Sequence, residues 1–175
     1  MADGILKVGQ ITTSSGSGTI NLGVSGETIT SSAVMGSGMG KVLQVVSTTD
    51  TSERSSTSTS FVTGSNTLSV NITPASTSNK VFVCVSLGSG NNTSAQHTYT
   101  TIYRDASNLG GSQGFLTNYQ GGTGEHYGGA SMSITDSPNT TSEVTYQVYF
   151  KVSGGTGKIN SSAGTGTITA MEIQG

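Results

Sequence analysis

The sequence predicts an all-β protein, in which an N-terminal arm of short strands precedes a single jelly-roll-like antiparallel β-sandwich. Three observations support this fold class. No window keeps helical periodicity for three turns. From Gly40 onward, short apolar runs separated by turn residues recur at the spacing of a β-sandwich. Alternation without a break in residues 144–152 gives one row of side chains that needs a partner sheet: Val144, Tyr146, Val148, Phe150 and Val152.

The strands of the sandwich follow one another from Gly40 to the C-terminus. Pro74 ends one strand because it offers no N–H to a ladder, and a turn at 136–139, which accounts for Asp136, precedes the long strand. The run 79–87 is the most hydrophobic and is expected to lie centrally. About eight strands after residue 40 suit a jelly roll. The segments expected to be extended are 41–46, 59–62, 68–73, 79–87, 97–104, 115–119, 130–135, 144–152, 158–160 and 167–173.

Residues 1–39 are expected to form a separate unit, an arm that ends in a Gly/Ser linker before the domain of residues 40–175. Its short strands cannot bury their own apolar faces, because a lone hairpin is marginal in water. We therefore expect the arm to pair with other copies of the chain or to lie on another protein. A frayed tail is the less favoured alternative, since a solvated tail would not carry these apolar residues: Ile5, Leu6, Val8, Ile11, Ile20 and Leu22.

The composition favours an oligomer. Charged residues make up only 9% of the chain and hydrophobic residues 31%, while Ser and Thr together make up about a third, well above their usual share. This composition predicts a thin core. A thin-cored chain of short strands gains stability by burying further surface between copies.

The charge pattern argues against several classes of partner. Seven basic and nine acidic residues give a net charge of −2, and no basic run suggests a nucleic-acid groove or an anionic membrane patch. No apolar stretch is long enough for membrane insertion, and the N-terminus does not resemble a signal peptide. The single cysteine, Cys84, lies in an apolar run and is expected to be a small core residue.

No catalytic or metal-binding motif is recognisable, so we expect no enzymatic activity and no cofactor. His97 and His126 lack a second ligand at metal spacing. The acidic residues are scattered, and a calcium loop at Asp50 and Glu53 would lack the regular oxygen spacing of a strong site. The glycine patterns do not match a phosphate-binding loop.

The glycine-rich segment 110–129 contains the only candidate recognition site. Tyrosines in such segments can stack on sugars or serve as interface anchors. Tyr99 and Tyr103, by contrast, are expected to pack in the core. We therefore expect a receptor-binding or intersubunit loop formed by Tyr119, Glu125, His126 and Tyr127.

Four segments in order resemble a domain that is common in tailed phages, especially those of marine and freshwater bacteria. These are GKVLQVV (40–46), ITPASTSNK (72–80), DSP leading into TYQV (136–138 and 145–148), and ITAMEI (168–173). The resemblance covers Gly40 to the C-terminus. Residues 15–23, SGSGTINLG, are similar to the fibre-like stretches that precede this domain in such proteins.

The resemblance implies a tail-fibre-like virion structural protein, assembled in the bacterial cytoplasm and located on the virion surface. It also implies a homotrimer of β-sandwiches. The arm would dock on a tail protein or on the major capsid protein, and the sandwich would attach to a host, with a surface glycan as one candidate partner. Because only about 40 residues precede the sandwich, a capsid decoration or cement protein remains an alternative. A lectin-like carbohydrate-binding module is a lesser one.

Overall fold

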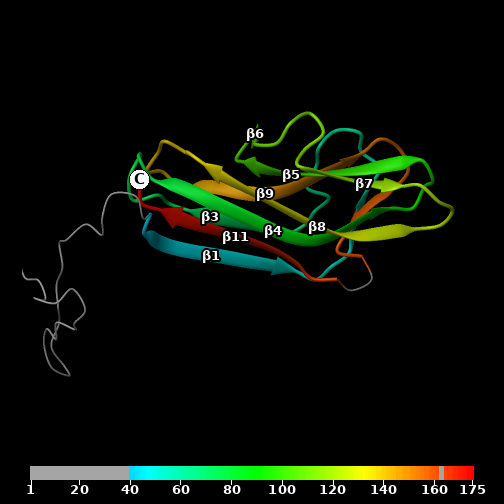
Figure 1. The fold of residues 1–175 in the computed structure, drawn as a ribbon, viewed down its shortest axis with the longest axis horizontal. Coiled ribbons are helices and arrows are strands. Elements are labelled where there is room, and N and C mark those ends of the chain that lie inside the picture. Colours follow the sequence, from blue (N-terminus) through cyan, green and yellow to red (C-terminus); the bar gives the residue numbers. More distant parts are fainter. Residues whose placement is uncertain (1–39, 162–163) are drawn as a thin grey trace, which may run out of the picture. The chain divides into compact units, whose positions relative to one another are not determined.

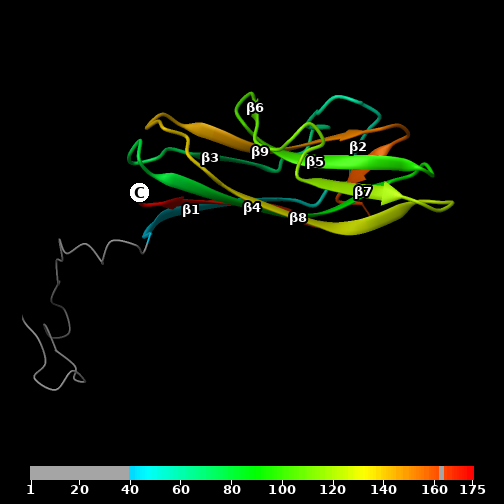
Figure 2. The same ribbon diagram turned by 45° about the horizontal axis from the view of Figure 1, so that its top comes forward.

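A computed structural model describes residues 40–161 and 164–175. The predicted arm, with Ile5, Leu6, Val8, Ile11, Ile20 and Leu22, lies outside the described residues. The described part of the chain is all-β, with eleven strands in two antiparallel sheets that pack face to face (Figures 1 and 2). It contains no helix that is long and apolar enough to cross a membrane. The predicted all-β sandwich is confirmed.

The first sheet is organised around β4, which pairs with β8 from Val81 to Asn91. On its other side β4 pairs with β11 and then with β10, which follow each other along the same edge. The central position expected for residues 79–87 is therefore confirmed. The six strands of this sheet are β1 (Val42–Asp50), β2 (Arg54–Ser56), β4 (Lys80–Asn91), β8 (His126–Asp136), β10 (Gly157–Ile159) and β11 (Gly166–Ile173).

The second sheet is organised around β9 and β5, which pair with each other over seven residues. The free edge of β9 takes β3, and the free edge of β5 takes β7 and β6. Its five strands are β3 (Ser69–Ile72), β5 (Gln96–Arg104), β6 (Ser107–Asn108), β7 (Leu116–Gln120) and β9 (Val144–Val152).

The core lies between β4 and β9. The predicted row of alternating β9 side chains is buried, and Tyr146, Val148 and Phe150 are fully covered. Valines of β4, among them Val81 and Val83, belong to the same buried cluster. Burying one such side chain contributes about 1.5–3 kcal/mol. The buried side chains of β4 and β9 therefore supply much of the hydrophobic stabilisation.

The expected strand at 59–62 is wrong. Only Val62 is bridged, to Phe150, through two backbone hydrogen bonds of 3.0 and 2.9 Å. The Ser58 hydroxyl instead donates to the Ser60 carbonyl at 2.7 Å and accepts from the Ser60 N–H. Such local side-chain bonds compete with a strand ladder. Two short strands, β2 and β6, were not expected from the sequence.

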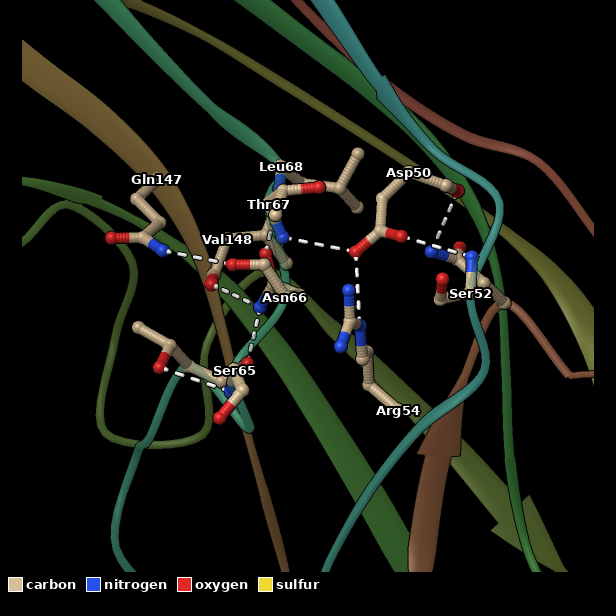
Figure 3. A network of polar contacts seen from close by, with 11 residues as sticks. Asp50, Ser52, Arg54, Ser65, Asn66, Thr67, Leu68, Gln147 and Val148 are labelled. Carbon is tan, nitrogen blue, oxygen red and sulfur yellow. Dashed lines mark hydrogen bonds and ion pairs between the residues drawn. The ribbon is translucent and has the colours of Figure 1, made fainter.

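A buried carboxylate fixes the chain between β1 and β3 (Figure 3). Asp50 accepts hydrogen bonds from the backbone N–H groups of Ser52 and Thr67, both at 2.9 Å, and from Arg54 Nε at 3.2 Å. Burial alone would raise the pKa of Asp50, but the bonds from Thr67, Ser52 and Arg54 outweigh it and hold the pKa below its ordinary value. Asp50 therefore has a structural role.

Acid should destabilise the sandwich through Asp50 and Glu172, another buried carboxylate whose pKa is lowered. Both pKa values are lower in the folded than in the unfolded chain. Their stabilisation is therefore present above the ordinary values of 3.8 and 4.5 and is lost as the pH falls through the folded values. We expect urea midpoints to stay level from pH 7 to about 5 and to fall steeply below about 4. A level midpoint down to pH 3 would contradict this account.

Candidate functional site

The two ends of the sandwich differ in what they carry. Gly40, where the domain begins, and the C-terminus lie together at one end, where the Gln174 N–H donates to the Lys41 carbonyl at 2.9 Å. The turn between β7 and β8 lies at the opposite end in both views (Figures 1 and 2). β4 runs from Lys80, paired with Ile173, to Asn91, paired with His126, a span of about 36 Å at the usual rise per residue.

The β7–β8 turn forms an open hollow of about 350 Å³. Three of the four residues expected to form a recognition loop line it, namely Tyr119, Glu125 and His126. The remaining lining residues are Gln120, Gly121, Gly122 and Thr123. The structure therefore brings most of the predicted loop residues to one place.

The turn is held by a buried amide. Gln120 is only 3% exposed, and its side-chain nitrogen donates to the Gly124 carbonyl across the turn. The backbone carbonyl of Gln120 accepts from the Ala95 N–H at 2.7 Å. Gly124 has a φ of +96°, a conformation that favours glycine. These contacts give the turn a defined shape.

Tyr119 is the exposed aromatic group of the hollow, with 51% of its surface accessible. Its ring packs on His97 with a centroid distance of 4.7 Å, and His97 stacks on Tyr99 at 5.5 Å. The expectation that Tyr99 packs in the core is wrong. Thr98, Thr100 and Ile102 take the buried positions of β5, and the tyrosines occupy the outer face.

Tyr103 also lies on the outer face of this sheet, contrary to expectation. It stacks on Tyr149 at 4.0 Å and meets Phe61 edge-on at 6.2 Å. The Lys151 ammonium lies 4.7 Å from the Phe61 ring centre and donates to the Ser112 carbonyl at 2.7 Å. Sequence reasoning missed this aromatic surface, although the alternation of β5 and β9 contains its signal.

Tyr127 is not among the residues that line the hollow. Residues 126–129, expected in a loop, continue β8 and pair with β4. Gly90 permits this, because a Cβ there would come within 2.2 Å of the Tyr127 ring. The Tyr127 ring instead lies 5.8 Å from the ammonium of Lys158.

Beside the hollow, one ammonium group is shared by two carboxylates. Lys158 contacts Glu125 at 3.1 Å and Glu53 at 3.2 Å. The Tyr127 hydroxyl and the Lys158 ammonium together hold the pKa of Glu125 below its ordinary value, so its carboxylate is ionised at neutral pH. Asp50 and Glu53, the two carboxylates considered for a calcium loop, have different partners: Asp50 pairs with Arg54 and Glu53 with Lys158. Within residues 40–161 and 164–175, no three His, Cys, Asp or Glu side chains are grouped to hold a metal ion.

The lining of the hollow is suited to recognition. It offers an aromatic ring, a hydroxyl, an imidazole and one carboxylate. A glycosidase would need a second carboxylate across the site, and none of the lining residues supplies one. The arrangement can stack and hydrogen-bond a small polar ligand.

No protein-family model matches the sequence, and no curated protein matches it. Among solved structures, a chain from the structure of infectious bursal disease virus Gx strain is similar, with 14% sequence identity and a TM-score of 0.34. The alignment covers 76% of the present chain and 37% of that chain, so the chain spans little more than a third of that length. A likeness at this level carries no argument about function.

Proposed function

We propose that the chain is a non-enzymatic phage virion surface protein, a tail-fibre-like homotrimer that is anchored by residues 1–39 and uses its β-sandwich for host attachment. The observation that carries the proposal is that the two ends of the sandwich carry different features. The chain enters at one end, beside the C-terminus, and the hollow with Tyr119 lies at the other. A domain attached in this way directs its exposed aromatic group away from the point of attachment.

The homotrimer is supported by exposed apolar side chains on β1. Val42, Leu43 and Val45 are 49%, 39% and 55% exposed on a strand that pairs on one edge only. Val45 lies beside Met171 of β11, which lies beside the half-buried Phe82 of β4. Covering such a row with another protein surface removes apolar area from water.

Light scattering of the full chain should give the mass of three chains. The exposed row on β1 supplies the reason, because a monomer would leave it in water. Val45→Ser removes apolar area from the row and should shift the population toward smaller species, whereas Thr49→Ser, on the same strand, should not. A stable monomer at micromolar concentration would remove the trimer from the proposal.

A capsid decoration protein is the second candidate, and the same β1 row supports it as a surface for lateral contact with a shell. Copy number separates the two candidates. Quantitative mass spectrometry of purified virions should find only a few trimers per particle relative to the major capsid protein, because tail fibres are few. Near parity with the capsid protein would overturn the tail assignment in favour of a cement protein.

A further inference from the structure

We propose that the hollow at the β7–β8 turn binds a neutral saccharide, with the ring of Tyr119 as its stacking surface. The inference deepens the proposed host attachment and rests on it for its biological role. The hollow, at about 350 Å³, falls within the range of about 300–1,000 Å³ that small-molecule sites occupy.

The Tyr119 ring is preorganised for stacking. His97 packs against it at 4.7 Å, and Tyr99 supports His97 at 5.5 Å. An exposed ring held in this way loses little conformational freedom when a ligand covers it. The C–H face of a sugar ring is apolar and flat enough to cover such a surface, while its hydroxyls remain at the edge. Tyr119 therefore supplies an apolar contact within an otherwise polar site.

The polar residues of the hollow suit hydroxyl groups. A sugar hydroxyl both donates and accepts, so its site needs partners of both kinds. The Glu125 carboxylate only accepts, and the Thr123 hydroxyl can donate or accept. His126 adds a ring nitrogen of either kind. These three side chains surround the space beside Tyr119.

The charges select against acidic sugars. None of the residues that line the hollow is a lysine or an arginine. The ammonium of Lys158, which contacts Glu125 at 3.1 Å, is shared with Glu53 at 3.2 Å. An anionic sugar would lose solvation without gaining a cation and would meet the Glu125 carboxylate. A neutral saccharide incurs neither cost.

The test is binding of the full chain to an array of defined neutral and acidic glycans. We expect binding to neutral glycans only, and a loss of about tenfold or more in affinity for Tyr119→Ala, since an aromatic contact of this kind is worth on that order. Tyr149→Ala is the matched control, because Tyr149 stacks on Tyr103 away from the hollow. Both variants should keep the thermal midpoint of the parent within a few degrees.

A second variant covers the ring without deleting a polar group. A Cβ at Gly121 would lie 3.2 Å from the Tyr119 ring, so Gly121→Val should also weaken binding by about tenfold or more. Binding to acidic glycans only, binding unaffected by Tyr119→Ala, or no binding to any glycan would overturn the inference. If Tyr119→Ala nevertheless reduces adsorption of particles to host cells, the attachment function stands and only the ligand class is wrong.

Discussion

Replacing Glu172 with alanine is expected to lower the free energy of unfolding by about 3 kcal/mol, because the change leaves buried donors without an acceptor. Glu172 is only 1% exposed. Its carboxylate accepts from Gln44 Nε2 at 2.6 Å, from the Ala75 N–H at 2.7 Å and from Asn79 Nδ2 at 2.5 Å. One side chain of β11 thereby joins β1 and the segment between β3 and β4.

Urea unfolding of the full chain would measure this loss. Glu143→Ala is the control, since the only hydrogen bond of that carboxylate that the structure shows is an exposed one, from Asn71 at 3.3 Å, and its removal should change stability by less than about 0.5 kcal/mol. The loss of unfolding free energy for Glu172→Gln should lie between the losses for these two variants. The amide oxygen of glutamine can still accept a hydrogen bond, but its NH₂ group would face other donors. Equal midpoints for the Glu172 and Glu143 variants would mean that water replaces the carboxylate.

Sequence patterns predicted the parts of the fold in which one face of a strand is plainly more apolar. The β9 row is buried as expected, because a period of two sends Val144, Tyr146 and Val148 to the same side. On β11 the same period of two puts Glu172 on the buried face with Ile168 and Ala170. It could not reveal its hydrogen-bond partners, which are 93 to 128 residues away along the chain.

The pattern failed where both faces of a strand are compatible with burial. In β5, Thr98, Thr100 and Ile102 compete with His97, Tyr99 and Tyr103 for the inner face. The structure places the threonines and Ile102 between the sheets and the three rings on the outer face. Alternation identifies the two rows of a strand, but the space opposite each row is a property of the partner sheet.

The candidate site was predicted only in part, because strand pairing and register cannot be read from a local pattern. Composition drew attention to the glycine-rich segment, and Tyr119, Glu125 and His126 do meet there. Nothing local indicated that residues 126–129 would pair with β4, because that pairing depends on the small residues opposite, Gly88 and Gly90. The pairing of residues 126–129 with β4 separates Tyr127 from the hollow. The support of Tyr119 by His97 likewise depends on the register of β7 with β5.

The corner after β8 provides the second large expected effect. The turn itself was expected to account for Asp136, but the carboxylate accepts from Arg104 Nη1 at 2.7 and 2.9 Å and from the Tyr146 hydroxyl at 2.7 Å. These residues belong to β8, β5 and β9, so the contact joins the two sheets. Burial first, and the Asp136 carboxylate second, raise the pKa of Tyr146 and keep its hydroxyl protonated as a donor.

Asp136→Ala is therefore expected to cost about 3 kcal/mol, near the lower limit for breaking a buried charge pair, because the Arg104 side chain is 26% exposed and partly solvated. Tyr146→Phe removes one hydrogen bond to a charged acceptor and should cost about 1.5 kcal/mol. Urea unfolding of both single variants and of the double variant forms a cycle. If Asp136 and Tyr146 act through their shared bond, the double variant should be clearly more stable than the sum of the single losses predicts. Strict additivity would show that Asp136 stabilises the corner through Arg104 alone.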